Sequence, residues 1–568
     1  MPGWKPVWHG KEKPILEKQL RESVTAVFPL WPPGDAPGAG CRRAVASSRR
    51  KLCEGQKSAQ DRKDPMMDER WNEKIPNWTA KRAFLTPDRT AVIFHDEKIT
   101  FRQLFQEAKK TAEKLFRLGC GSGKKAAVLL KNRPESLYLL AALQLCGTVT
   151  VFLNHRLTPG ELLFQLKDSG ADLLVADETF REKCEAIRTE LSALNIVYLR
   201  ELDGLEGKPD PLKEEFALDD VCSVMYTSGT TGFPKGVLQT YGNHWWSAVG
   251  SVINLGLAPE DAWALAVPLF HISGFSIFIR SLIYGIPVVL YEKFEPERIN
   301  RDLREGKISI ISLVPQMLSA LIEGLGDGTY HERLRCVLLG GGPAPVRLLQ
   351  ICKEKGIPVY QTYGLTETCS QIVTLAPEDS LEKIGSAGKP LFPNQLRIVS
   401  PDDPETDLAP KQIGEIAVKG PVVMKGYYRR EESNAKSFLP GGWFLTGDLG
   451  YVDEEGFLYV VDRRADLIIS GGENIYPAEI ENVLLSHPSV QEACVVGVDD
   501  EKWGQVPFAF YVRKKGCEVG REELEQYCRK HLASYKVPKG WEEVDRLPRN
   551  AANKLMRREL KKLAKELR

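Results

Sequence analysis

The alternation of helical patterns with short apolar runs constrains the fold of this chain more than any other feature. From about Trp71 onward, segments with apolar residues three and four positions apart, such as Leu104 to Leu118, alternate with runs such as Ala126 to Leu130. The first pattern is typical of amphipathic helices and the second of strands buried on both faces. Their alternation predicts an α/β fold of mostly parallel sheets flanked by helices. Further elements are expected at Leu137 to Leu145, Leu173 to Val175, Ile308 to Val314 and Val337 to Leu339.

The pattern changes in the last third of the chain. Gly414 to Val418 and Gly456 to Val461 alternate in the manner of antiparallel strands. After Asp462-Arg463-Arg464 comes a stretch of about 100 residues with strand and helix signals of its own. We therefore place a domain boundary between Asp462 and Asp466.

The first 66 residues differ from the rest of the chain. Up to residue 65 they contain eight prolines, and thirteen Lys or Arg against seven Asp or Glu, without sustained periodicity. Such a composition cannot bury enough apolar surface to offset the entropy of ordering. We expect residues 1–66 to be a disordered extension. Two alternatives are a targeting or partner-binding arm and a native start at Met66 or Met67.

Charge and cysteine content exclude several classes of partner. Lys plus Arg is 77 and Asp plus Glu is 76, so there is no electrostatic case for binding nucleic acid. Two uncharged stretches, Ser136 to His155 and Ala262 to Ile279, are interrupted by Gly, Pro or His, and no membrane span is expected. Twelve scattered cysteines without a CxxC pair indicate reduced thiols and a cytoplasmic protein. The oligomeric state is left open, with a homo-oligomer as one alternative.

The strongest local motif is the run from Tyr226 to Gly236, YTSGTTGFPKG, which follows a short apolar segment. Its glycines let the backbone fold closely around an anion, and its hydroxyls and single Lys235 add donors. These features suit a polyphosphate, although the Gly-Lys-Ser/Thr order of the Walker loop is missing. The alternative is a flexible polar loop.

This loop resembles the phosphate loop of the adenylate-forming superfamily, which contains acyl- and aryl-CoA synthetases, peptide-synthetase adenylation domains and luciferases. Four further segments match in order, and the resemblance extends from about Trp71 to the C-terminus: Tyr363 to Glu367, Thr446 to Asp448, Asp462 to Arg464, and Pro548 to Lys554. The resemblance implies an AMP-binding N-terminal domain over residues 67–464 that includes a β-barrel-like subdomain. It also implies a small, mobile α+β C-terminal domain over residues 465–568.

Within that superfamily the chain most resembles the o-succinylbenzoate–CoA ligases of menaquinone biosynthesis. The segments that suggest this are Thr240 to Trp245, Pro268 to Gly274 and Leu339 to Pro345. The resemblance implies adenylation of 2-succinylbenzoate by ATP with Mg²⁺, and then transfer of the acyl group to CoA, with AMP and pyrophosphate as the other products. Another aryl- or fatty-acyl-CoA synthetase is the first alternative. A luciferase-like oxygenase and a nucleotide-sensing scaffold are two more.

The resemblance also implies roles for individual residues. Lys554 would bridge the substrate carboxylate and the α-phosphate, Glu367 would bind Mg²⁺ with Thr230 as a weaker ligand, and Asp448 would accept the ribose hydroxyls. From composition alone, Lys554 is a residue of a solvated basic tail and Asp448 a turn residue. Tyr363 would offer a flat face to adenine. The expected ATP site comprises Thr227, Ser228, Gly229, Thr230, Thr231, Lys235, Gly341, Gly342, Tyr363, Gly364, Thr366, Asp448 and Arg463.

The acid and CoA sites are expected beside the ATP site. His271, grouped with Lys554 and Glu367 as catalytic, would position the acid at the pocket mouth, although a lone histidine in an apolar stretch is ordinarily a core residue. Arg280 is either a cation at a helix end that reaches water or a buried partner for a carboxylate. The expected acid site is His271, Ser273, Arg280, Ser312 and Thr366, and the expected CoA site is Ser470, Gly471 and Gly472. One departure concerns the hinge, where Ala465 stands at a place that holds Asp or Lys in many relatives.

Overall fold

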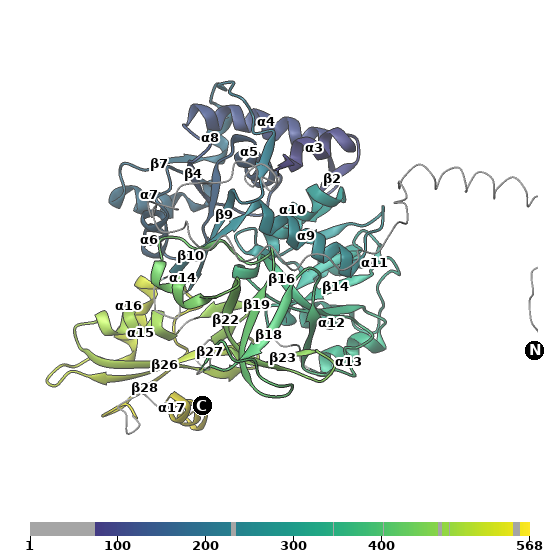
Figure 1. The fold of residues 1–568 in the computed structure, drawn as a ribbon. Helices are drawn as coiled ribbons and strands as arrows, with labels where there is room; N and C mark the ends of the chain where they lie inside the picture. Colours follow the sequence, from purple (N-terminus) through teal and green to yellow (C-terminus); the bar gives the residue numbers. More distant parts are fainter. Residues whose placement is uncertain are drawn as a thin grey trace, which may run out of the picture. The chain divides into compact units, whose positions relative to one another are not determined.

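The computed structural model describes residues 74–228, 234–342, 344, 346–401, 403–463, 468–475, 477–548 and 557–567 (Figure 1). At a few of these positions, including Ser228 and residues 461–463, it describes the backbone but not the side chain. The predicted extension over residues 1–66 lies outside the described residues. So do Gly229, Thr230 and Thr231 of the phosphate loop, and Lys554.

A seven-stranded sheet forms the first layer, in the order β20-β10-β9-β5-β4-β6-β7. Five of its strands run parallel and are linked by helices, while β10 and β20 pair antiparallel at one edge. The predicted α/β alternation is therefore confirmed. The elements are β4 (Lys125–Leu129), α5 (Pro134–Cys146), β5 (Val149–Phe152), α6 (Pro159–Ser169), β6 (Leu173–Ala176), α7 (Arg181–Glu190), β7 (Asn195–Tyr198), α8 (Leu199–Asp203), β9 (Val221–Ser228), β10 (Pro234–Thr240) and β20 (Gly426–Tyr427).

The uncharged stretch that begins at Ser136 forms a helix, a stop and a strand, as predicted. Helix α5 ends at Cys146, Gly147 follows with φ of +68°, and β5 begins at Val149. A left-handed residue after the last helical turn favours glycine, which has no Cβ to clash. No helix among the described residues is both long and apolar enough to cross a membrane.

A second, fourteen-stranded sheet carries several of the predicted site residues. Its parallel strands β2, β12, β11, β13, β14 and β15 continue through β16 and β17 into the antiparallel strands β23, β22, β19 and β18. The antiparallel texture predicted near Gly414 is thus confirmed. The strands are β2 (Thr90–Phe94), β3 (Glu97–Thr100), β11 (Trp263–Leu265), β12 (Val288–Leu290), β13 (Ile310–Leu313), β14 (Cys336–Leu339), β15 (Val359–Leu365), β16 (Ser370–Leu375), β17 (Ser386–Pro390), β18 (Gln395–Val399), β19 (Gly414–Lys419), β21 (Phe438–Leu439), β22 (Trp443–Val452) and β23 (Leu458–Arg463).

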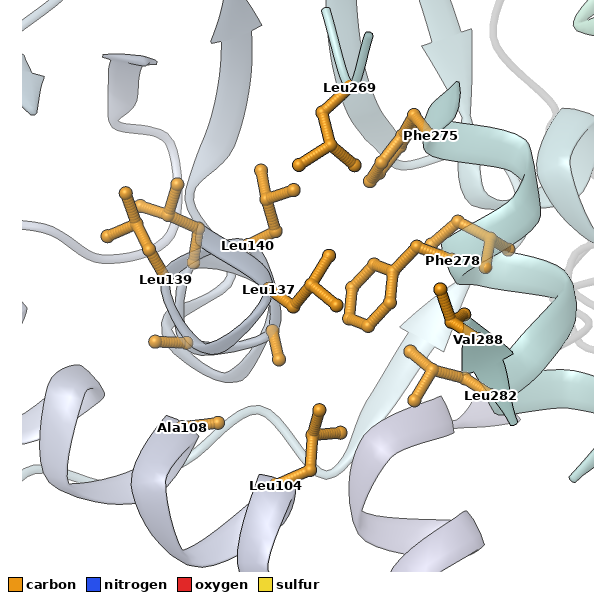
Figure 2. Close-up of a cluster of buried hydrophobic side chains, with 14 of the residues drawn as sticks. Leu104, Ala108, Leu137, Leu139, Leu140, Leu269, Phe275, Phe278, Leu282 and Val288 are labelled. Atoms are coloured by element: carbon orange, nitrogen blue, oxygen red, sulfur yellow. The ribbon is translucent and has the colours of Figure 1, made fainter. Parts of the chain in front are cut away.

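Apolar helix faces pack between the two sheets. Figure 2 shows α5 end-on, with Leu137 facing Phe278 of one neighbouring helix and with Leu104 and Ala108 of another helix below it. All of these side chains are buried, which removes a large apolar area from water. The helices around this sheet are α3 (Trp78–Leu85), α4 (Phe101–Arg117), α9 (Tyr241–Leu255), α10 (Ile272–Tyr284), α11 (Pro296–Arg304), α12 (Pro315–Leu325), α13 (Val346–Glu354) and α14 (Glu431–Ser437), and a short pair, β1 (Lys74–Pro76) and β8 (Glu215–Ala217), joins α3 to the sheet region.

The C-terminal part of the chain folds around its own five-stranded sheet, β25-β24-β27-β26 with β28 beside β27. It has two apolar clusters of its own, one on each face of the long β26–β27 hairpin. The elements are β24 (Ile468–Ser470), β25 (Glu473–Ile475), α15 (Pro477–Ser486), β26 (Val490–Asp500), β27 (Gly504–Arg513), α16 (Arg521–His531), β28 (Gly540–Glu543) and α17 (Arg557–Glu566).

Candidate active site

A cavity of about 540 Å³ lies at the carboxyl ends of the parallel strands β13, β14 and β15. This edge of a parallel sheet is where α/β proteins usually bind ligands. The first turn of α10, the β22 segment Thr446–Asp448 and the C-terminal segment Gly471–Glu473 complete the wall. The predicted site residues that line this cavity are Thr227, His271, Ser273, Arg280, Ser312, Gly341, Gly364, Thr366, Glu367, Asp448, Gly471 and Gly472.

Glu367 stands beside the strands that carry the phosphate loop. Its Oε1 accepts hydrogen bonds from the Thr227 hydroxyl at 3.3 Å and from the Tyr427 hydroxyl at 3.1 Å. Thr227 pairs with Lys235 across the β9–β10 hairpin, and the Lys235 ammonium lies 5.0 Å from the centre of the Tyr427 ring. Burial lowers the pKa of Lys235, although the Glu367 carboxylate opposes the shift. A carboxylate and an ammonium group therefore flank the expected phosphate position.

This arrangement fits a magnesium ion that is shared with a nucleotide. No cluster of three or more His, Cys, Asp or Glu side chains that could hold a metal occurs within the part of the chain that the structure describes. A protein cage is not required, because Mg²⁺ in nucleotide enzymes is commonly held by one or two carboxylates, phosphate oxygens and water. Glu367 is the carboxylate suited to this role, and the ion would neutralise charge on the phosphates.

Asp448 is held at the opposite side of the cavity. Its Oδ2 accepts a 2.7 Å hydrogen bond from the Tyr363 hydroxyl, and its backbone N–H donates to the Thr446 hydroxyl. In the sheet, Asp448 of β22 is the register partner of Arg463 of β23, whose side chain lies outside the description. The buried Asp448 carboxylate thus has a fixed direction, as a ligand for ribose hydroxyls requires.

Tyr363 is held by its own strand and by Asp448. Its ring packs in the apolar cluster of the antiparallel strands, and its hydroxyl donates a hydrogen bond to Asp448. Its neighbours Thr362 and Gly364 line the cavity. Side chains alternate between the two faces of a strand, so residues on either side of Tyr363 point the other way. The contact of Tyr363 with adenine stays a prediction. Of the two glycines predicted for the ATP site, Gly341 lines the cavity and Gly342 does not.

Arg280 is the most unusual side chain of the cavity wall. It projects from the middle of α10, is only 2% exposed, and has no acidic partner among the described residues. Its Nε finds no hydrogen-bond partner, and Nη2 donates a long 3.4 Å bond to the Ser247 hydroxyl. Burial lowers the pKa of Arg280. Because a buried charge is costly without a partner, Arg280 is suited to receive an anionic ligand. The alternative of a helix-end cation that reaches water is wrong.

Neutral groups hold the Arg280 guanidinium in place. The guanidinium lies 5.3 Å from the ring centre of Trp263, and the Trp263 indole N–H donates at 3.0 Å to the Ser312 hydroxyl. Ser247, which accepts from Arg280, donates in turn to the Cys369 carbonyl at 2.7 Å. Ser312 and Arg280 are therefore linked through one indole ring, and both line the cavity.

His271 stands at the junction of the cavity with the C-terminal part. It occupies the N-cap position of α10, where its side chain makes no capping bond, and its Nε2 lies 3.4 Å from Glu473 Oε1. The Arg156 guanidinium pairs with the same carboxylate oxygen. Burial alone would raise the pKa of Glu473, but His271, followed by Arg156 and Lys536, lowers it to about 2.

The glycines of the expected CoA site adopt conformations that other residues rarely reach. Gly471 and Gly472 have φ of +57° and +84°, and a Cβ on Gly471 would lie 2.8 Å from the Trp503 ring. A Cβ on Gly472 would be 3.4 Å from Val314, next to the acid-site strand β13. The backbone therefore comes close to both neighbours, as a narrow channel requires. Ser470 is buried at the end of β24 and does not contribute to the wall.

Arg156 was not predicted as a site residue, whereas Glu473 belongs to the segment Ser470 to Asn474 that the family resemblance places along the CoA channel. Arg156 and Glu473 meet although they are 317 positions apart in the sequence. The polar run Asn154-His155-Arg156 comes one residue after the end of the buried strand β5, and polar residues at the carboxyl end of a parallel strand are a signal that could have identified Arg156. Thr366 lines the cavity, and its carbonyl accepts from the Gln239 side chain at 2.8 Å.

Comparison with known proteins identifies the family of this chain. Residues 79–428 match the model of the AMP-binding enzyme family, and residues 479–554 match that of the AMP-binding enzyme C-terminal domain. The 2-succinylbenzoate–CoA ligase of Geobacillus kaustophilus (strain HTA426) is 54% identical over 489 residues, which cover 86% of this chain and 98% of that protein.

Two solved structures of o-succinylbenzoate CoA synthetase from Bacillus subtilis are 49% identical to this chain, covering 86% of it and 98% of the relative. The TM-score is 0.82 for a double mutant bound to the product analogue OSB-NCoA and 0.67 for the complex with the acyl-adenylate intermediate OSB-AMP. Since the family model covers more than half of the chain and curated relatives match it over most of their length, the chain belongs to the AMP-binding enzyme family.

Proposed function

We propose that the protein is an ATP-dependent 2-succinylbenzoate–CoA ligase. It would adenylate the succinyl carboxylate, release pyrophosphate, and then transfer the acyl group to the CoA thiol with loss of AMP, in menaquinone biosynthesis. The proteins of two Geobacillus strains that are named 2-succinylbenzoate–CoA ligase are 52% and 54% identical to this chain. The match covers 97% and 98% of their lengths. The cofactors that follow are ATP with Mg²⁺, and CoA as the second substrate.

One observation carries the choice of acid, namely the buried Arg280 without an acidic partner. 2-Succinylbenzoate has a reacting succinyl carboxylate and a second carboxylate on the ring. When the ring carboxylate leaves water, it needs a cation or several donors. Arg280 offers the only fully buried guanidinium of the described cavity wall. We infer that it binds the ring carboxylate, with Ser312 and Ser273 as further donors.

The adenylation step requires two anions to approach each other. The succinyl carboxylate is already ionised at neutral pH, so no base is needed to activate it. Its oxygen attacks the α-phosphorus of ATP, and the bond to pyrophosphate breaks. Preorganised cations and donors lower this barrier. By the family resemblance, Lys554 bridges carboxylate and α-phosphate, while Lys235, Thr227 and Glu367 lie where the phosphates and Mg²⁺ are expected, and Asp448 holds the ribose.

The thioester step uses the C-terminal segment that lies at the cavity. The CoA sulfur attacks the acyl carbon of the adenylate, the carbon–sulfur bond forms, and AMP leaves. We infer that Gly471 and Gly472 border the channel for the pantetheine arm and that the described arrangement is the thioester-forming one. The higher TM-score to the relative that holds a product analogue supports this inference, because sequence identity and coverage are the same for both comparison structures.

A substrate panel tests the proposal. Pyrophosphate release is measured with ATP, Mg²⁺ and each of 2-succinylbenzoate, 4-oxo-4-phenylbutanoate, benzoate and a medium-chain fatty acid, and thioester formation is then measured after addition of CoA. We expect 2-succinylbenzoate to be used best, since it alone has a ring carboxylate for Arg280 in addition to the carboxylate that reacts. Equal or better use of the fatty acid or benzoate would favour another acyl-CoA synthetase. Adenylation without thioester formation for every acid would contradict a CoA ligase.

Two broader properties belong to the same proposal. We propose a cytoplasmic location, on the ground that the cysteines of the described residues are free thiols. Fractionation of the source cell would test it. A homo-oligomer stays open, and light scattering of the full chain would give its mass.

A further inference from the structure

A buried cluster of three charges joins the C-terminal part to the first sheet layer. The Lys536 ammonium lies 2.7 Å from Glu161 Oε1 of α6 and 2.7 Å from Glu479 Oε1 of α15. The side chains of Lys536, Glu161 and Glu479 are only 5%, 11% and 9% exposed. We call these three residues the Lys536 cluster. Because these side chains are largely withdrawn from solvent, water and salt screen their charges little.

Glu161 is fixed by its own helix before it meets Lys536. Its Oε2 accepts from the Thr158 backbone N–H at 2.8 Å and from the Thr158 hydroxyl at 2.9 Å, which closes a capping box at the start of α6. The remaining oxygen, Oε1, is therefore directed outward from the helix. A carboxylate held in this way loses little side-chain entropy when it accepts an ammonium group.

Apolar contacts surround the cluster. Ala533 and Tyr535, which precede Lys536, pack against the apolar cluster formed by α6 and the parallel strands β4, β5 and β6. The Thr158 hydroxyl also donates to the His531 carbonyl at 3.4 Å. Residues 531–536 thus lie on α6, and they form a contact separate from the one between Glu473, His271 and Arg156 at the cavity.

We propose that Glu161 and Lys536 are a positioning pair for the thioester-forming step. Two separate contacts fix the direction of a rigid part better than one, so the pair holds Gly471, Gly472 and Glu473 at the cavity wall. The inference rests on the proposed function, in which the C-terminal part turns a different face toward the cavity during adenylation. In that other orientation Lys536 leaves Glu161, and the pair contributes nothing to adenylation.

The charges of the cluster make its stability depend on pH. Two carboxylates share one ammonium group, and the further groups near them are the Tyr535 hydroxyl, the Lys183 ammonium and the Glu473 carboxylate. Burial and the charge of Glu161 raise the pKa of Glu479 to about 7, although Lys536 opposes this, whereas Lys536 lowers the pKa of Glu161. Glu479 is therefore protonated in the docked state below about pH 7. Because its docked pKa is the higher one, Glu479 stabilises the docked state fully below its ordinary value of 4.5 and loses that contribution as pH rises through 7. Glu161, whose docked pKa is lowered, has the opposite dependence and loses its contribution on acidification.

The test separates the two half-reactions in the full chain. Adenylation is measured as pyrophosphate release in the absence of CoA, and thioester formation as single-turnover product from supplied acyl-adenylate and CoA. Glu161→Gln keeps a side chain that can cap α6 but removes the charge, and Lys536→Met removes the ammonium group. Lys565→Met is the matched control, because it removes a positive charge from an exposed pair with Asp499 inside the C-terminal part.

We expect Glu161→Gln and Lys536→Met to slow thioester formation by roughly tenfold to a hundredfold, since each breaks the buried ion pair between the first sheet layer and the C-terminal part. Adenylation should stay within about twofold of wild type, the size of change expected at an uninvolved site. The double variant should lose less than the product of the two single losses, and Lys536→Arg should recover most of the rate. The weakening of thioester formation above about pH 7 should disappear in Glu479→Gln.

Several results would contradict the proposed role of Glu161 and Lys536 in thioester formation. Equal loss in both half-reactions would indicate a general structural role, and unchanged thioester formation would exclude the pair from that step. If Lys536→Met does not fold, as its circular dichroism would show, Glu161→Gln with its intact helix cap decides the matter by itself. A wild-type protein that adenylates the acid but forms no thioester refutes the proposed function instead, which keeps the two failures distinct.

Discussion

Replacement of Arg280 by alanine is the most direct test of how the cavity selects its acid. The wild-type guanidinium is 2% exposed, has no acidic partner among the described residues, and makes one long hydrogen bond to a neutral hydroxyl. Its charge is therefore available to a ligand. In Arg280→Ala the bound ring carboxylate would be buried without a cation, and the loss of one member of a buried charge pair costs about 2–5 kcal/mol.

That cost converts into a measurable rate change. At 1.4 kcal/mol for each factor of ten, kcat/KM for 2-succinylbenzoate should fall by roughly 30-fold to 4,000-fold. For 4-oxo-4-phenylbutanoate, which lacks the ring carboxylate, kcat/KM should hardly change. Pyrophosphate release is followed for both acids with each variant, so that the ratio of the two values cancels any common loss of active protein.

A matched control is available in the same chain. Arg298 also lies over an aromatic ring, 4.9 Å from the centre of Tyr291, but it does not line the cavity. Arg298→Ala should leave the ratio between the two acids unchanged. Arg280→Lys should recover part of the preference, because it keeps the charge without the planar fork. An Arg280→Ala protein that loses the same factor with both acids, or with neither, would refute the assignment.

Three further predictions concern other parts of the chain. Lys554→Ala should slow adenylation by about a hundredfold or more while thioester formation from supplied acyl-adenylate changes much less, and equal losses would contradict its role. Glu473 has a pKa lowered to about 2, so it contributes stability that is complete above the ordinary value of 4.5 and is lost as pH falls toward 2. The unfolding free energy of wild type should accordingly exceed that of Glu473→Gln near neutral pH, and the difference should shrink on acidification. A chain that begins at Met67 should match the full chain in thermal midpoint and ligase rate, whereas a lower midpoint would indicate that the extension packs on the rest.

Local sequence patterns predicted most of the fold. The run from α5 through Gly147 to β5 illustrates why, since periodicity, a left-handed stop and a β-branched run are all properties of neighbouring residues. The carboxyl ends of the parallel strands then brought Ser312 and Glu367 to one cavity, which is where α/β proteins usually bind ligands. Asp448 reaches the same cavity from the antiparallel strand β22, and only the family motif indicated it.

Contacts between distant segments were harder to predict. Lys536 belongs to a run, SYKVPK, that reads as solvated surface, yet it is buried between two carboxylates from different parts of the chain. Arg156 likewise meets Glu473 only because of how the C-terminal part lies on the cavity. The hydrogen bond from the Tyr363 hydroxyl to Asp448 also joins residues 85 positions apart, and the two motifs gave no indication of it. Such contacts depend on tertiary arrangement and not on any local pattern.

A short segment of chain connects the large sheet to the C-terminal part, since β23 ends at Arg463 and β24 begins at Ile468. Five Cα–Cα steps join these two residues, and a fully extended chain covers at most about 3.6 Å per step, or roughly 18 Å in all. The C-terminal part therefore cannot diffuse away from the cavity in either of the two orientations that the proposed function requires. Its local concentration stays far above that of a separate protein in the cell, in the millimolar range that short linkers give. A reactive acyl-adenylate would then meet the second catalytic face before it could escape into water, and a longer tether would lose that advantage while every contact in either orientation stayed the same.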